Sequence, residues 1–380
     1  MSTPRIKELR RVYGFDEVAI VPGELTINPE LVSTDFPIDG ITLRTPVLAS
    51  AMDAVGSPKF AGKMSELGGM GVMNLEGVQA RYDDPDEILN QIVTTPQDEV
   101  TGLLQKLYSA PIRHNLVGER VEEMKKNGAV CAVSVTPAKT KELAPVAAEA
   151  GADMIVVQST VTTARHISNS ARGLRFPELL EMLNVPMLVG NCVGYDVALE
   201  LMETGIHGVL VGVGPGAACT TREVTGVGVP QVSATLDCAA ARDEYYERTG
   251  RYVPIVTDGG IRTGGDLCKA FACGADAVML GTPLAQAEEA PGKGYNWGMA
   301  NPHPALPRGT RVKVGINGSL EEILYGPTSV TDGTQNLMGA LQVCMGMIGA
   351  QTIQEMHEAE VVVAPSIKTE GKHYQLGLDS

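Results

Sequence analysis

A glycine-rich stretch near the middle of the chain, residues 211–231, presents one cysteine among polar side chains. It reads VGVGPGAACTTREVTGVGVPQ, so that Cys219 is followed directly by Thr220, Thr221 and Arg222. Glycine has no Cβ and tolerates positive φ, which lets the backbone of such a loop approach a ligand closely. A thiol held among backbone amides and a cation ionises more readily and becomes a nucleophile. Cys219 is therefore a candidate nucleophile; the alternative is that it packs as a small apolar residue.

The remaining cysteines and the overall composition exclude several classes of protein. Six cysteines lie among apolar residues and glycine, which predicts packing roles for Cys131, Cys192, Cys238, Cys268, Cys273 and Cys344. Seven cysteines without a CxxC pair indicate a reducing compartment. The formal net charge of −15 argues against nucleic acid or an anionic membrane as a partner. No signal peptide and no membrane-spanning run are expected, so we predict a cytoplasmic protein.

Three further stretches combine glycine with a hydroxyl or carboxyl group. Ser50–Asp53 (SAMD), Asp258–Gly260 (DGG) and Gly281–Thr282 each follow a short apolar run. Backbone N–H groups in such loops bind phosphate, and an aspartate beside them can accept hydrogen bonds from a ribose diol. Ordinary turns use the same residues, but two glycine-rich ends in consecutive units favour a phosphate site.

Eight short apolar runs could act as the strands that position these residues. They are residues 47–49, 71–73, 129–135, 154–157, 187–189, 209–211, 255–257 and 277–280. Helical spacing lies between several of them, at residues 58–67, 141–150, 197–204 and 266–273. Gly151, Gly205 and Gly274 each end a helical pattern just before a strand. The alternation predicts an α/β fold, a TIM (β/α)8 barrel; an open sheet would need a GxGxxG after its first strand.

The 380 residues, 44% of them hydrophobic, are expected to form one barrel domain over residues 1–380. Two connections are longer than usual. Residues 75–128 show helical character at 85–93, 100–107 and 119–126. Residues 283–327 follow the last strand and contain His303, which predicts a short flap or lid on the C-terminal face. Residues 360–380 form a polar tail.

Taken together, these motifs resemble the IMP dehydrogenase/GMP reductase family over nearly the whole chain. The most specific is GVGPGAACTTREVTGVGVPQ, supported by PVLASAMDAVGS, LVGNCVG, VTDGGIRTGGDLCKAFACGADAVMLGT and GALQVCMGMIGAQTI. The resemblance implies that Cys219 attacks C2 of the purine and that Thr221 positions or activates the hydrolytic water. It further implies IMP and XMP as ligands, NAD and K⁺ as cofactors, and a homotetramer or octamer.

The resemblance also implies roles for other residues. The nucleotide would be bound at its phosphate, ribose and base by Ser50, Met52, Asp258, Gly260, Gly281, Thr282, Gly298 and Met299. The NAD contacts would be Gln158, Ser159, Thr160, Asn191 and Gly212. The backbone carbonyls of Gly214, Gly216 and Cys219 would bind K⁺, and residues 369–371 resemble the segment that completes a neighbour's cation site.

The chain departs from the family pattern at several places. Residues 75–128 are too short for the pair of CBS modules that typical dehydrogenases carry, so we expect no CBS insertion; reductases lack these modules as well. Gln158 stands where the family usually has an aspartate for the nicotinamide ribose. The flap is reduced to residues 301–311 and lacks the Arg-Tyr pair that activates water. Arg308 and Arg311 are the remaining candidate bases, with Thr221 and His303 as alternatives.

Two local features favour dehydrogenase over reductase. Residues 223–225, Glu-Val-Thr, are closer to dehydrogenases than to the Lys-Lys-Thr of reductases, and Arg308 stands where reductases have glutamate. We therefore expect an NAD-dependent IMP dehydrogenase of guanine nucleotide biosynthesis, acting through a cysteine thioimidate. The alternatives are a GMP reductase, deaminating GMP with NADPH, and a non-catalytic regulator that binds purine nucleotides. A regulator would have no need of a nucleophile.

Overall fold

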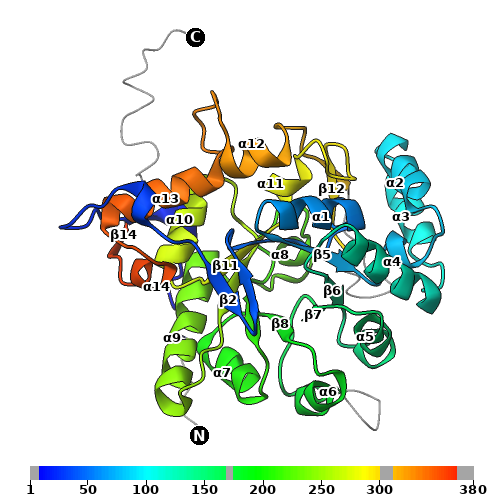
Figure 1. Ribbon diagram of the computed structural model, residues 1–380, viewed down its shortest axis with the longest axis horizontal. Helices are drawn as coiled ribbons and strands as arrows, with labels where there is room; N and C mark the ends of the chain where they lie inside the picture. Colours follow the sequence, from blue (N-terminus) through cyan, green and yellow to red (C-terminus); the bar gives the residue numbers. More distant parts are fainter. Residues whose placement is uncertain (1–7, 168–173, 300–310, 366–380) are drawn as a thin grey trace, which may run out of the picture.

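The computed structural model describes residues 8–167, 174–299 and 311–365. At its centre, eight parallel strands close into a barrel in the order β10-β11-β4-β5-β6-β7-β8-β9 (Figure 1). The predicted TIM barrel is therefore confirmed, together with all eight predicted strands. The strands are β4 Val47–Ala49, β5 Met70–Asn74, β6 Ala132–Val135, β7 Met154–Gln158, β8 Met187–Cys192, β9 Gly208–Val211, β10 Ile255–Asp258 and β11 Ala277–Leu280.

Both faces of each barrel strand are buried, which is why the strands read as continuous apolar runs in the sequence. Val156 on β7 and Val256 on β10 belong to the cluster of side chains inside the barrel. Because successive side chains of a strand alternate, Gln158 and Asp258, two residues further on, also face inward. The last residues of these strands are thus aimed at the barrel axis.

Helices surround the barrel, as predicted from the apolar spacing (Figure 1). Gly151, Gly205 and Gly274 follow three of them with φ of 97°, 92° and 101°, a conformation that L side chains rarely adopt, which confirms their role at helix ends. The surrounding helices are α1 Pro58–Glu66, α4 His114–Lys126, α5 Thr140–Glu149, α6 Phe176–Leu183, α7 Tyr195–Glu203, α9 Gln231–Thr249, α10 Gly264–Ala272 and α13 Leu337–Ile348.

The long connection between β5 and β6 is helical, as predicted. It contains η3 Val78–Ala80, α2 Pro85–Thr94 and α3 Val100–Leu107 before α4. Figure 1 shows α2 and α3 together at one side of the molecule, outside the ring formed by the barrel helices. These elements fill the connection, so no CBS pair is inserted there.

A hairpin of β2 Phe36–Ile38 and β3 Ile41–Leu43 closes the end of the barrel at which the strands begin. Its apolar side chains join the interior cluster. Ile38 reaches the start of β9, since a Cβ placed on Gly208 would lie 3.5 Å from Ile38 Cδ1. The carboxyl ends of the strands therefore remain as the face for a site.

The remaining elements lie around this framework. β1 Val18–Ile20 pairs antiparallel with β14 Val361–Val363, so the start of the predicted polar tail is ordered against the N-terminal segment. After β11, strands β12 (Tyr295–Trp297) and β13 (Arg311–Lys313) form a hairpin within the predicted flap region. The elements are η1 Phe15–Glu17, η2 Pro29–Leu31, α8 Thr221–Thr225, α11 Thr282–Ala285, β12 Tyr295–Trp297, β13 Arg311–Lys313, α12 Leu320–Tyr325 and α14 Ile353–Met356. Across the described ranges, no helix combines the length and apolar character that crossing a bilayer requires.

Candidate active site

Gln158, Asn191 and Asp258 form a polar network at the carboxyl ends of β7, β8 and β10. Gln158 Nε2 donates hydrogen bonds to Asn191 Oδ1 at 2.9 Å and to Asp258 Oδ2 at 2.9 Å, and Asn191 Nδ2 donates to the same Oδ2 at 2.7 Å. Burial raises the pKa of Asp258 to about 6, while the two amide hydrogen bonds act in the opposite direction. Because both amides meet Oδ2, Oδ1 is the oxygen better placed to accept bonds from a ligand.

The cysteine loop, residues 212–220, leads from β9 to α8. Cys219 is half-buried, and its Sγ lies 3.2 Å from Thr221 Oγ1. The Cys219 backbone N–H donates to the Gly216 carbonyl at 3.1 Å, which closes a turn immediately before the thiol. Cys219 and Thr221, predicted as nucleophile and water-positioning residue, are thus in direct contact.

Arg222 joins the two ends of this segment. Its Nε donates to the Val213 carbonyl at 3.2 Å and its Nη2 to the Val229 carbonyl at 2.7 Å. The side chain also lies against Gly214, where an added Cβ would be 2.7 Å from Arg222 Cγ. The cation that follows the cysteine in sequence therefore holds the shape of the loop through backbone carbonyls.

The cysteine loop packs on the turn that follows Asp258. A Cβ on Gly260 would lie 3.1 Å from Pro215 Cβ, and one on Gly259 would lie 3.1 Å from Pro215 Cγ. Gly212, with φ of 146°, lies even closer to this turn, since a Cβ there would be 2.4 Å from the Asp258 carbonyl oxygen. These glycines allow the nucleophile's loop to contact the predicted ribose and phosphate turn. Gly212, predicted as a cofactor contact, has this packing role in the structure.

Ser50 and Gly281, predicted from separate motifs, lie side by side. Ser50 N donates to the Leu280 carbonyl at 2.9 Å, and a Cβ on Gly281 would be 3.2 Å from Ser50 Oγ and 3.3 Å from Met52 Sδ. Ser50 Oγ is buried and has no hydrogen-bond partner among the described residues. Because a buried unpaired hydroxyl is costly, this position suits a polar ligand such as a phosphate oxygen.

Asn296 is a further candidate site residue, which the sequence did not reveal. It lies on β12 and is buried, with its Nδ2 atom 3.9 Å from the position of a Cβ on Gly281. Its Oδ1 accepts a hydrogen bond from Trp297 N at 2.9 Å, which fixes the amide. Thr282, the first residue of α11, follows Gly281. The signal that could have identified Asn296 is its place two residues before Gly298, in a segment already predicted to contact the base.

Met52, Gly298 and Met299, the predicted base contacts, are half-buried, and both methionines pack against the same hydrophobic cluster. Ser159 and Thr160 follow Gln158 in a turn against β8. The Ser159 hydroxyl donates to the Val161 carbonyl at 2.9 Å, so it serves to order this turn. The predicted cofactor contacts at the ends of β7 and β8 are therefore neighbours in space.

Arg311, a predicted candidate base, makes its side-chain contacts with α2, Gln97 and Tyr295. Its guanidinium donates to the Ile92 and Val93 carbonyls at the end of α2 and to Gln97 Oε1 at 3.2 Å, and its Cζ lies 4.4 Å from the centre of the Tyr295 ring. The side chain is buried. These contacts direct the guanidinium to α2, Gln97 and the Tyr295 ring, so the structure does not support Arg311 as a base.

Of the other candidate bases, the structure describes Thr221 alone. Arg308 and His303 lie outside the described residues, as do residues 369–371 of the tail. Thr221 is the candidate that the structure places against the cysteine.

For K⁺, the described residues contain no group of three or more His, Cys, Asp or Glu side chains that could hold a metal. A monovalent cation at the cysteine loop would therefore depend on backbone carbonyls, which are suitable ligands for K⁺.

The other cysteines have the packing roles predicted for them. Cys131, Cys192, Cys238, Cys268 and Cys273 are buried, and Cys344 on α13 is half-buried. Burial raises the pKa of Cys131 and of Cys273 to about 12, which keeps these thiols protonated.

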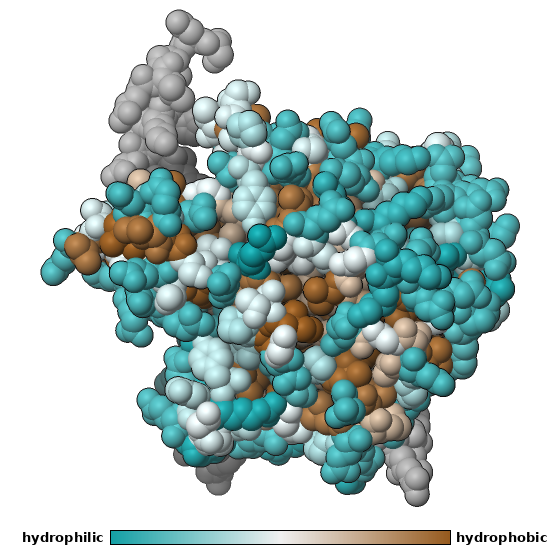
Figure 2. All heavy atoms as spheres, viewed as in Figure 1, coloured by the Kyte–Doolittle hydropathy of each residue, from teal (hydrophilic) through white to brown (hydrophobic). Residues whose placement is uncertain are grey.

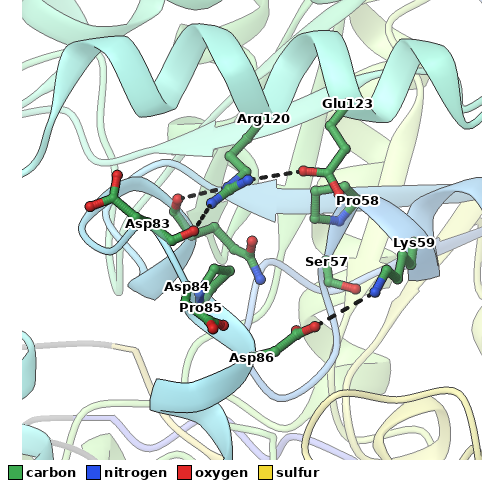
Figure 3. A pocket seen from close by; sticks show the side chains of 10 residues that line it. Ser57, Pro58, Lys59, Asp83, Asp84, Pro85, Asp86, Arg120 and Glu123 are labelled. Atoms are coloured by element: carbon green, nitrogen blue, oxygen red, sulfur yellow. Dashed lines mark hydrogen bonds and ion pairs between the residues drawn. The ribbon is translucent and has the colours of Figure 1, made fainter.

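A separate polar cavity of about 300 Å³ lies where the N-terminal ends of α1 and α2 meet α4. Figure 3 shows Arg120 directed to Glu123, at 3.0 Å, and Lys59 directed to Asp86, at 3.6 Å. None of the predicted site residues line this cavity. Its lining residues differ from those of the candidate active site, so the two are distinct.

Comparisons with known proteins agree with this fold. The family model for the IMP dehydrogenase / GMP reductase domain matches residues 12–372. An uncharacterized oxidoreductase of Mycolicibacterium smegmatis is 40% identical, over 93% of this chain and 97% of that protein. Inosine-5'-monophosphate dehydrogenase of Cryptosporidium parvum is 29% identical, over 92% of this chain and 91% of that protein. The crystal structure of an IMP dehydrogenase/GMP reductase-like protein from Corynebacterium glutamicum superposes with a TM-score of 0.89 at 36% identity, covering 96% of this chain and 97% of that chain.

The closed eight-stranded barrel, together with these relatives, defines this protein as an oxidoreductase of the TIM-barrel class. The chain belongs to the IMP dehydrogenase/GMP reductase family.

Proposed function

We propose that the protein is an IMP dehydrogenase, which oxidises IMP to XMP with NAD⁺ in guanine nucleotide biosynthesis. The observation that carries this proposal is the contact between Cys219 Sγ and Thr221 Oγ1, at 3.2 Å, on a loop packed against the turn after Asp258. A nucleophile in contact with a hydroxyl and next to a ribose-binding carboxylate suits covalent attack on a nucleotide base.

The proposed nucleotide site has three parts. Ser50, Gly281 and Thr282 with the turn at Gly260 would bind the phosphate, since the buried Ser50 hydroxyl has no partner in the part of the chain that the structure describes. Asp258 would accept hydrogen bonds from the ribose hydroxyls through Oδ1. The base would lie between Met52 and the backbone of 298–299.

In the proposed reaction, the Cys219 thiolate adds to C2 of IMP: the S–C2 bond forms, the C2=N3 π bond breaks and N3 takes up a proton. A hydride, which bound NAD⁺ would accept, then leaves C2 and gives a covalent thioimidate. Water attacks C2 and the S–C2 bond breaks, which releases XMP, the free thiol and one proton. Thr221 would position that water, because its hydroxyl touches the sulfur. Arg308 remains a candidate base for activating that water, whereas the contacts of Arg311 favour a structural role.

Two cofactors belong to this proposal. NAD⁺ would be held by Gln158, Ser159, Thr160 and Asn191 at the ends of β7 and β8, and when bound it accepts the hydride. K⁺ would be bound by the carbonyl oxygens of Gly214, Gly216 and Cys219. We also propose a cytoplasmic homotetramer or octamer.

The assay that tests the proposal follows absorbance of the reduced nicotinamide in two reactions with K⁺, one with IMP and NAD⁺ and one with GMP and NADPH. We expect NAD⁺ reduction by IMP, loss of turnover in Cys219→Ala with IMP binding retained, and a covalent Cys219 adduct by mass spectrometry. Cys344→Ala, which removes the other half-buried thiol, is the matched control and should retain activity.

Other outcomes would contradict the proposal in distinct ways. Oxidation of NADPH by GMP would identify a GMP reductase acting through the same cysteine. Nucleotide binding with neither reaction and no adduct would identify a regulatory binding protein.

A further inference from the structure

The Tyr108 hydroxyl group is at the centre of a buried cluster behind the proposed base site. Tyr108 directly follows α3, and its hydroxyl donates to Asp53 Oδ2 at 2.5 Å. Trp297 Nε1 donates to the Tyr108 oxygen at 2.9 Å, and Asp53 Oδ2 also accepts from Val78 N at 2.8 Å. All three side chains, Asp53, Tyr108 and Trp297, are buried. A buried hydroxyl that accepts one bond and donates another fixes the segments around it relative to one another.

Two of the segments joined by Tyr108 are those proposed to contact the base. Asp53 directly follows Met52, and Trp297 is two residues before Met299. The Tyr108 oxygen itself lies 3.5 Å from Met299 Sδ. One hydroxyl group therefore holds both proposed walls of the base site, although Tyr108 comes from neither motif.

The same helical segment holds the β12–β13 hairpin at a second point. Gln97, between α2 and α3, donates from Nε2 to the Arg311 carbonyl at 3.0 Å and accepts from Arg311 Nη2 at 3.2 Å. Trp297 lies on β12 and Arg311 on β13, so both strands of the hairpin are bonded to the connection between β5 and β6. That connection thus supports the proposed base site from outside the barrel.

We propose that Tyr108 is a positioning residue for purine binding, through which the α2–α3 segment sets the separation of Met52 and Met299. This inference rests on the proposed function, because it takes these two residues as base contacts. Loss of the Tyr108 hydroxyl leaves Asp53 and Trp297 without that partner and allows the two walls to shift. The effect falls on nucleotide affinity, since Tyr108 does not reach the reacting cysteine through any of these contacts.

The test is an IMP titration of the purified full-length protein, read by tryptophan fluorescence and by calorimetry. Trp297 is the only tryptophan in the chain, so its emission reports on this cluster. Tyr108→Phe should bind IMP roughly tenfold more weakly and raise KM with little change in kcat, as expected for loss of one buried hydrogen bond. Tyr82→Phe is the matched control, because its hydroxyl donates to the adjacent Leu107 carbonyl at 2.9 Å and should leave IMP affinity unchanged.

The outcomes separate this inference from the function on which it rests. Equal IMP affinities of the wild type and Tyr108→Phe, with both folded by circular dichroism, overturn the inference alone. Absence of IMP binding by the wild type overturns the proposed function and the inference with it. If Tyr108→Phe does not fold, the Trp297 emission of the wild type decides whether the inference holds. A shift of Trp297 emission at saturating IMP supports the inference, and unchanged emission with IMP bound by calorimetry overturns it.

Discussion

Asp258 shows how burial sets the chemistry of a single residue in this protein. Desolvation favours the neutral carboxyl group and raises its pKa to about 6, whereas the amides of Asn191 and Gln158 favour the ionised form. The folded-state pKa lies above the ordinary value, so the folded protein binds more protons between about pH 4 and 6. The contribution of this group to stability therefore falls as pH rises through that range.

The same shift predicts the pH dependence of catalysis. At the proposed ribose contact, Asp258 would accept hydrogen bonds best when ionised, so kcat/KM for IMP should fall as pH drops through about 6. Gln158→Glu places a second carboxylate near Asp258 and should move this limb upward by about one unit or more. Gln158→Met removes the hydrogen bonds without adding charge and should move the limb less.

The measurement is a pH series of kcat/KM for the wild type and both variants with the same substrate. The IMP phosphate ionises identically in all three reactions, so a difference between the profiles belongs to the protein. Coincident profiles for the wild type and Gln158→Glu would show that Asp258 does not control this limb.

Among the elements, α1 and β5 show how closely this barrel is packed around the first site loop. Ser57 caps α1 by accepting a hydrogen bond from Phe60 N at 3.2 Å, and Pro58 occupies the first helical turn, where it needs no donor. The helix then lies so close to β5 that a Cβ on Gly71 would be 2.5 Å from Ala61 Cα. The sequence of β5 needs glycine there because backbone opposes backbone.

Two Gly→Ala substitutions should therefore have opposite effects on stability. Gly71→Ala forces α1 away from β5 and should lower the free energy of unfolding by about 1–3 kcal/mol. Gly102→Ala adds a methyl group inside α3 where nothing lies within 4 Å, and should raise the free energy of unfolding by roughly 0.5–1 kcal/mol. Urea denaturation of both variants and the wild type gives the comparison; destabilisation by Gly102→Ala or a neutral Gly71→Ala would contradict it.

Across the whole molecule, apolar side chains gather where the N-terminal segment meets α13. Leu25 and Met347 are 68% and 58% exposed. Their segments are in contact, since Gly23 N donates to the Met347 carbonyl at 3.2 Å and a Cβ on Gly349 would be 3.5 Å from Leu25 Cβ. Figure 2 shows hydrophobic residues at the left edge, where Figure 1 draws these elements. A patch of this kind suits contact with another copy of the chain.

The proposed tetramer gives this patch a testable role. Met347→Glu should weaken assembly, because it places a charge in an apolar contact, and should lower the mass measured by light scattering at micromolar concentration. Ile316→Glu is the matched control, since Ile316 is also 58% exposed but lies on the loop after β13. An unchanged mass of Met347→Glu would exclude this patch from the interface, and a monomeric wild type would contradict the tetramer.

The sequence by itself determined the barrel, because eight apolar runs with helices between them allow few other ways to bury both faces of each strand. It also identified Cys219, Ser50 and Asp258 as candidates, since each lies at the end of a strand or in the loop that follows one, and the carboxyl ends of parallel strands meet on one face. Local sequence is sufficient for these predictions because each depends on a strand and the loop that follows it.

Tertiary structure alone decided which residues support the site. Tyr108 bonds to Asp53 and Trp297, which are 55 and 189 positions away along the chain, and no local pattern encodes such a contact. Arg311 looked like a candidate base in the sequence, but folding aims its guanidinium at the carbonyls that end α2. The direction of a long side chain is set by the partners that packing brings to it, and those partners come from distant parts of the chain.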